Sequence, residues 1–156
     1  MKAFHFLRIA AVLTLLYCAG HTSGMPWTPY TDAEAKSVVE TMKTHSFAEQ
    51  GFQGTYWDLY LGFGLVISLY LLTQGVVLWQ VASLAKTEPR RVRPIVVSFL
   101  VAFVINVALS WKYFFVVPVV LGGLIASCLA IALILAARPQ AAQRTHSADK
   151  PVPAGL

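Results

Sequence analysis

The sequence predicts an all-α integral membrane protein: a four-helix bundle with both termini in the cytoplasm and a short amphipathic helix in the outer loop 21–55. Three observations lead to this prediction: four apolar stretches, an uneven distribution of basic residues, and a low content of charge. The chain of 156 residues is 57% apolar and 12% charged. Because soluble proteins average about 25% charged residues, this composition suits a bilayer better than water.

The four apolar stretches predict membrane spans at about 4–20, 57–85, 94–111 and 114–137. A helix needs roughly 20 apolar residues to cross a bilayer core of about 30 Å, so the first stretch lies at the lower limit. Together the spans form one transmembrane domain, residues 1–138. Residues 139–156 are polar and contain three prolines, which predicts a disordered cytoplasmic tail.

Basic residues gather on one side of such a bundle. Only Lys36, Lys43 and Lys112 fall on the side of the outer loop. The other side holds Lys2, Arg8, Lys86, Arg90, Arg91, Arg93, Arg138, Arg144 and Lys150. Since cytoplasmic loops carry an excess of Lys and Arg, this bias predicts a multi-pass protein of the cytoplasmic (inner) membrane. It also accounts for the net charge of +5, so we expect no nucleic-acid partner.

The first apolar stretch has two interpretations. Lys2 and Arg8 precede an apolar run from Ile9 to Ala19, which is also the layout of a secretory signal peptide. We expect a retained transmembrane helix, with a cleaved signal peptide as the alternative.

The outer loop contains the predicted amphipathic helix. Pro26 and Pro29 exclude a regular helix before it. Thr31 and Glu34 have the spacing of a capping box, which predicts that Thr31 is the N-cap. Apolar residues then recur at helical spacing, at positions 35, 38, 39 and 42. Gly51 and Gly54 break regular structure before the second span.

Few polar side chains lie inside the spans, and no span interior holds an Asp, Glu or Lys. Intramembrane ionisable residues are typical of ion and proton pathways, so their absence argues against a pump or an ion-coupled transporter. Gln74 and Asn106 are the most notable polar residues. The expected role for both is hydrogen bonding between helices rather than ligand binding.

The outer ends of the spans are richer in polar groups. His21, Asp58, Asn106 and Lys112 form a candidate outer-rim cluster if the bundle is compact. A competing interpretation gives each residue a structural role, with Asp58 capping the second span. Interfacial aromatic residues are expected beside the cluster, since Trp and Tyr favour the membrane surface: Tyr56, Trp57, Tyr60 and Trp111.

No motif assigns a catalytic, metal or cofactor site. The four histidines (His5, His21, His45 and His146) have no ligand spacing, and Cys18 and Cys128 lie within apolar stretches as packing thiols. The sequence has no HExxH, GxSxG, P-loop or CxxC pattern. We therefore assign no catalytic residue, no metal ligand and no cofactor.

The segment from Tyr56 to Leu65, YWDLYLGFGL, the following Leu78-Trp79-Gln80 and the Gly20-His21 pair resemble a family of small uncharacterised bacterial membrane proteins with four spans. The resemblance covers roughly residues 5–137. It implies a retained first helix and a bacterial inner-membrane location, and it implies no reaction. It points to His21, Trp57 and Asp58 without giving them a role.

Three functions remain open. The leading hypothesis is a non-enzymatic accessory or lipid-interacting bundle whose partners are membrane lipid and either another membrane protein or a second copy of itself. The first alternative is an enzyme or redox component that acts on a lipid or quinone at the outer leaflet through the outer-rim cluster. The second is an oligomeric transporter subunit for a hydrophobic molecule.

Overall fold

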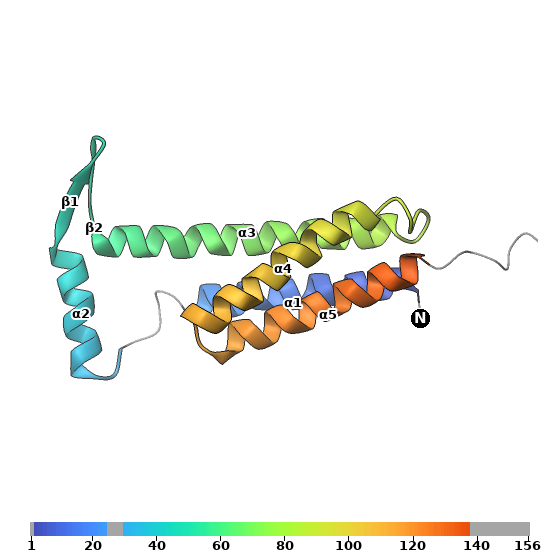
Figure 1. Cartoon of the computed structure of the whole chain (residues 1–156). Helices are drawn as coiled ribbons and strands as arrows, with labels where there is room; N and C mark the ends of the chain where they lie inside the picture. Colours follow the sequence, from blue (N-terminus) through green and yellow to red (C-terminus); the bar gives the residue numbers. More distant parts are fainter. Residues whose placement is uncertain (1, 25–29, 138–156) are drawn as a thin grey trace, which may run out of the picture.

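The computed structural model describes residues 2–24 and 30–137, and it is mostly helical (Figure 1). Four helices are long and apolar enough to cross a membrane: α1 (Ala3–Gly24), α3 (Tyr56–Leu84), α4 (Arg93–Tyr113) and α5 (Val116–Ala137). They coincide with the four predicted spans to within a few residues. The largest difference is at α1, which continues four residues beyond the predicted end. The predicted tail 139–156 lies outside the described residues.

Helix α1 occupies the centre of the bundle. It packs against α3 on one side and α5 on the other, and α4 packs against α5. Although the turn 85–92 joins α3 to α4 directly, these two helices make little contact with each other. The core consists of residues such as Leu7, Leu78, Ile125 and Leu129, which have no exposed surface.

Two glycines allow the helices to approach closely. A Cβ atom on Gly75 of α3 would lie 2.6 Å from Leu15 and 3.5 Å from the Ala11 carbonyl oxygen of α1. A Cβ atom on Gly122 of α5 would lie 2.9 Å from Val107 of α4. Small residues at helix contacts are typical of membrane bundles, where dispersion forces between closely packed backbones replace the hydrophobic effect.

A separate arm lies across one end of the bundle (Figure 1). It consists of α2 (Ala33–Thr44) and a hairpin of β1 (Ser46–Glu49) and β2 (Phe52–Thr55). We call this end of the bundle the arm end, and the opposite end, which holds the α3–α4 turn, the turn end. The hairpin was not predicted. Its two-residue turn, Gln50-Gly51, has positive φ angles of 49° and 86°.

Helix α2 is the amphipathic helix that the periodicity predicts, but its N-cap differs from the expected residue. Asp32, not Thr31, is the cap, and its carboxylate accepts a hydrogen bond of 2.6 Å from the Ala35 amide. A carboxylate at this position also interacts favourably with the positive end of the helix dipole, which a threonine hydroxyl cannot do.

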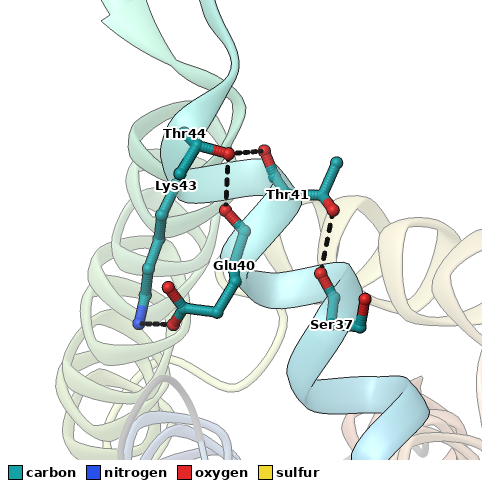
Figure 2. A network of polar contacts seen from close by, with 5 residues as sticks. All are labelled: Ser37, Glu40, Thr41, Lys43 and Thr44. Atoms are coloured by element: carbon teal, nitrogen blue, oxygen red, sulfur yellow. Dashed lines mark hydrogen bonds and ion pairs between the residues drawn. The ribbon is translucent and has the colours of Figure 1, made fainter.

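The polar face of α2 satisfies its own hydrogen bonds (Figure 2). Lys43 pairs with Glu40 at 3.2 Å, and the Thr41 and Thr44 hydroxyls donate to carbonyl groups one turn earlier in the same helix. All of these side chains are exposed. Ion pairs this exposed contribute little to stability, so this face is a polar surface whose contacts lie mostly within α2.

Helix α3 is the longest helix and projects beyond the other three at the arm end (Figure 1). It has 29 residues, against 22 in α1 and α5. A difference of this size corresponds to about 10 Å at 1.5 Å per residue. The arm packs around this projecting segment, since both α2 and β2 contact α3.

Candidate functional site

The structure offsets His21 from Asp58, two of the four residues of the predicted outer-rim cluster. Among the described residues, no hydrogen bond or ion pair joins any two of His21, Asp58, Asn106 and Lys112. The reason is the unequal length of the helices. His21 is level with Gly64 of α3, and Asp58 lies six residues further out, about 9 Å along the helix axis.

Asp58 belongs to the capping box of α3. Its Oδ2 accepts hydrogen bonds from the Thr55 amide at 2.8 Å and from the Thr55 hydroxyl at 2.7 Å. The Asp58 amide donates to the Thr55 hydroxyl at 3.1 Å. These reciprocal bonds satisfy backbone groups at the start of the helix, which is the structural role that the competing interpretation gave it.

His21 forms part of the contact between α1 and α3. Its Nε2 lies 3.1 Å from the Gly64 carbonyl oxygen. A carbonyl oxygen only accepts hydrogen bonds, so Nε2 carries the proton and donates it. The Nε2–H held in this way stabilises the contact between α1 and α3.

A polar seam continues this contact inward, and the sequence analysis missed it. The Thr22 hydroxyl lies 2.9 Å from the Ser68 hydroxyl, and the Cys18 thiol donates to the Ser68 carbonyl oxygen at 3.3 Å. We call Cys18, His21, Thr22, Gly64 and Ser68 the α1–α3 seam. Its thiol, hydroxyl and carbonyl groups carry no formal charge, and they join two apolar helices through hydrogen bonds.

Lys112 and Trp111 lie at the arm end of α4. The Lys112 Nζ is 5.1 Å from the ring of its neighbour Tyr113, and the Trp111 side chain is 78% exposed. Tyr56 and Tyr60 are exposed on the projecting part of α3, and Trp57 lies 5.6 Å from Tyr60, ring to ring. These positions suit interfacial anchors, and they lie on two separate helix ends.

The two intramembrane polar residues share a cavity. Gln74 of α3 and Asn106 of α4 line a space of about 200 Å³ between these helices, together with Tyr70 and Phe103. The Asn106 Oδ1 is buried and has no hydrogen-bond partner among the described residues. The cavity exists because α3 and α4 pack little against each other, and it leaves one acceptor of the apolar interior unsatisfied.

A second group of polar side chains lies at the turn end. Arg8 of α1 donates a hydrogen bond of 2.9 Å to the Ser83 hydroxyl of α3, and its guanidinium carbon is 3.6 Å from the centre of the Trp79 ring. Lys86 lies 5.4 Å above the Phe4 ring. From the sequence, Arg8 was only one of the basic residues that predict the topology, because nothing in its spacing relates it to Trp79.

These side chains border an open groove of about 580 Å³ on the surface of the α1–α3 pair. Its apolar walls include Ile9, Val12 and Leu13, and its only charged lining residues are Arg8 and Lys86. In the part of the chain that the structure describes, no group of three or more His, Cys, Asp or Glu residues could hold a metal ion.

No protein-family model, curated protein or solved structure matches the chain. The family resemblance of the segment from Tyr56 to Leu65 therefore stays a prediction.

Proposed function

We propose that this chain is a non-enzymatic, multi-pass protein of the cytoplasmic membrane that works by contact with lipid and with other membrane proteins. The observation that carries the proposal is the structural use of the outer-rim residues. His21 and Asp58, the two groups best suited to proton transfer, hold helix α3 through hydrogen bonds to backbone or cap groups.

The outer-leaflet enzyme alternative needs these groups within hydrogen-bond reach of one substrate. The axial offset between His21 and Asp58 weighs against it, as does the separate position of Lys112 on α4. The four long helices expose many large apolar side chains, which suits a protein that acts through its lateral surface in the membrane plane.

The proposal also includes a topology with both chain ends in the cytoplasm. Its support is the distribution of basic residues and the position of the first residues of α1 beside the turn 85–92, at the turn end (Figure 1). On this topology the arm faces the outside.

The test is complementation of cells that lack the protein, with variants that keep the hydrogen bond but remove acid–base chemistry. His21→Gln retains an amide donor for the Gly64 carbonyl, and Asp58→Asn retains a side-chain acceptor for Thr55. We expect both variants to accumulate and to reverse the defect of cells that lack the protein. His21→Leu, by contrast, should accumulate poorly. A variant that accumulates at the wild-type level but fails to complement would overturn the proposal in favour of an enzyme.

A further inference from the structure

We infer that the groove at the turn end binds an anionic phospholipid, with Arg8 and Lys86 at the phosphate and the apolar walls along an acyl chain. This inference deepens the proposed function and rests on it, because it names the lipid class and the site. Phe4, Arg8, Trp79 and Lys86 line the charged part of the groove, and Ser83 accepts a hydrogen bond from Arg8.

The first argument is the charge of the groove. Both charged lining residues are cations, and neither forms an ion pair with a carboxylate among the described residues. The nearest acidic residue along the chain, Glu88, already pairs with Arg91 at 3.0 Å. Two uncompensated cations beside a lipid-facing apolar surface call for an anionic ligand, because an unpaired charge near hydrocarbon is costly.

The second argument is the way Arg8 is held. The Trp79 ring covers one face of the guanidinium group, and Ser83 accepts one hydrogen bond from its edge. A guanidinium group has five N–H donors in a planar fork, so this arrangement fixes its orientation and leaves donors for a second acceptor. A phosphate oxygen pair is the acceptor that the fork matches best.

The third argument is depth. Arg8 lies five residues into α1, about 7.5 Å from the start of the helix at 1.5 Å per residue. Lys86 follows the end of α3 directly. The cations therefore lie near the membrane surface, where phosphates are found, and Ile9, Val12 and Leu13 extend from Arg8 toward the bilayer centre, where the acyl chains are found.

The same groove should discriminate against zwitterionic lipid. Phosphatidylethanolamine carries an ammonium group beside its phosphate, and this group would be repelled by Lys86. Phosphatidylglycerol offers the phosphate without the second charge. Basic residues near a membrane surface each contribute about 1 kcal/mol toward anionic lipid, which for two residues corresponds to a preference of about tenfold or more.

The experiment uses Trp79 as the reporter. The other tryptophans are replaced (Trp27→Phe, Trp57→Phe and Trp111→Phe), and the full chain is placed in phosphatidylcholine vesicles. Small amounts of phosphatidylglycerol or phosphatidylethanolamine with brominated acyl chains are then added, since bromine quenches nearby indole fluorescence. We expect brominated phosphatidylglycerol to quench Trp79 at about tenfold lower mole fraction than brominated phosphatidylethanolamine.

The test variant is Arg8→Gln/Lys86→Gln, and the matched control is Arg90→Gln/Arg93→Gln. The control removes the same charge from the same end of the molecule, and neither of its residues lines the groove. We expect the phosphatidylglycerol preference to disappear in the test variant and to persist in the control. If the double variant does not fold, Lys86→Gln alone replaces it, because this variant changes only an exposed side chain. It should lose about half of the preference for phosphatidylglycerol on a logarithmic scale.

Two outcomes overturn the inference. Equal quenching by both lipids in the wild-type protein would mean that the groove does not select charge. An equal loss in the test and control variants would mean a diffuse electrostatic attraction and no built site. The assay measures lipid binding alone, whereas the complementation experiment tests residues at the arm end, so a failure of this inference is distinguishable from a failure of the proposed function.

Discussion

The two ends of the α1–α3 pair use polar residues in opposite ways. At the arm end, the thiol, hydroxyl, imidazole and carbonyl groups of the α1–α3 seam hydrogen-bond across the interface between the helices. At the turn end, Arg8 also bonds across the interface, to Ser83, but it is charged and borders an open groove. The polar groups at the arm end therefore join helices, whereas those at the turn end remain available to a ligand.

This comparison has a physical basis. A neutral hydrogen bond between helices satisfies both partners, so nothing remains for a ligand to gain. A cation that contacts only an aromatic ring and one hydroxyl is not neutralised, so it can still attract an anion. Substitutions at the arm end should therefore change stability, and substitutions at the turn end should change lipid selection.

The largest effect is expected midway between the two ends. Gly75→Leu places a side chain where even a Cβ atom would meet Leu15 at 2.6 Å, so α1 and α3 must move apart and both ends are affected. We expect a loss of about 1–3 kcal/mol of unfolding free energy, as in other overpacked sites. The measurement is thermal or denaturant unfolding in detergent. Gly62→Leu is the control, since nothing lies within 4 Å of a Cβ atom there, and an equal loss in both variants would contradict the packing model.

The capping box of α3 should give the next largest effect. Thr55→Ala removes the hydroxyl that accepts from the Asp58 amide and donates to its carboxylate, at a cost of about 1 kcal/mol. Because the box lies on the projecting part of α3, hydrogen exchange should accelerate at residues 56–60 and remain unchanged beyond Gly64. Thr73→Ala, which removes a hydroxyl bonded only within the same helix, should leave this exchange pattern intact.

A smaller effect tests the seam itself. A double-mutant cycle with Thr22→Val and Ser68→Ala should give a coupling energy of about 0.6 kcal/mol, the average for hydrogen bonds between membrane helices. A coupling energy near zero would mean that the two hydroxyls do not act as a pair.

The smallest effect on stability is expected at the turn end. Ser83→Ala removes the exposed hydroxyl that accepts from Arg8, and we expect unfolding to change by less than about 0.5 kcal/mol. In the Trp79 quenching assay the same variant should weaken the preference for phosphatidylglycerol, because Arg8 loses its fixed orientation. A large loss of stability would place Arg8 among the residues that join helices and would remove the contrast between the ends.

The helices were predictable because each span depends on a long apolar run, and hydropathy alone identifies such runs. The hairpin was not predictable in the same way. A two-residue turn with two positive φ angles is usually signalled by Asn-Gly or Asp-Gly, and here Gln50 occupies the first position. The two glycines of this segment had suggested irregular backbone instead.

The candidate site was less predictable than the fold. The outer-rim cluster required His21 and Asp58 at one level, and the sequence does not show that Asp58 lies about 9 Å beyond His21 along α3. Thr22, Ser68 and Arg8 gain their roles from the register between α1 and α3, which pattern analysis of single helices does not give. Gln74 and Asn106 were expected to hydrogen-bond between helices; they line one cavity, and the Asn106 Oδ1 has no hydrogen-bond partner among the described residues.

The central position of α1 has a consequence for synthesis of the protein. Helix α1 is the earliest of the four long helices to leave the ribosome, yet one of its two packing partners, α5, is the last. The face of α1 that packs against α5 therefore meets lipid or an insertion factor until some 90 further residues have been made, since α5 begins only at Val116. The bundle can reach its final packing only after α5 has been made, whichever of the other helices has been inserted earlier.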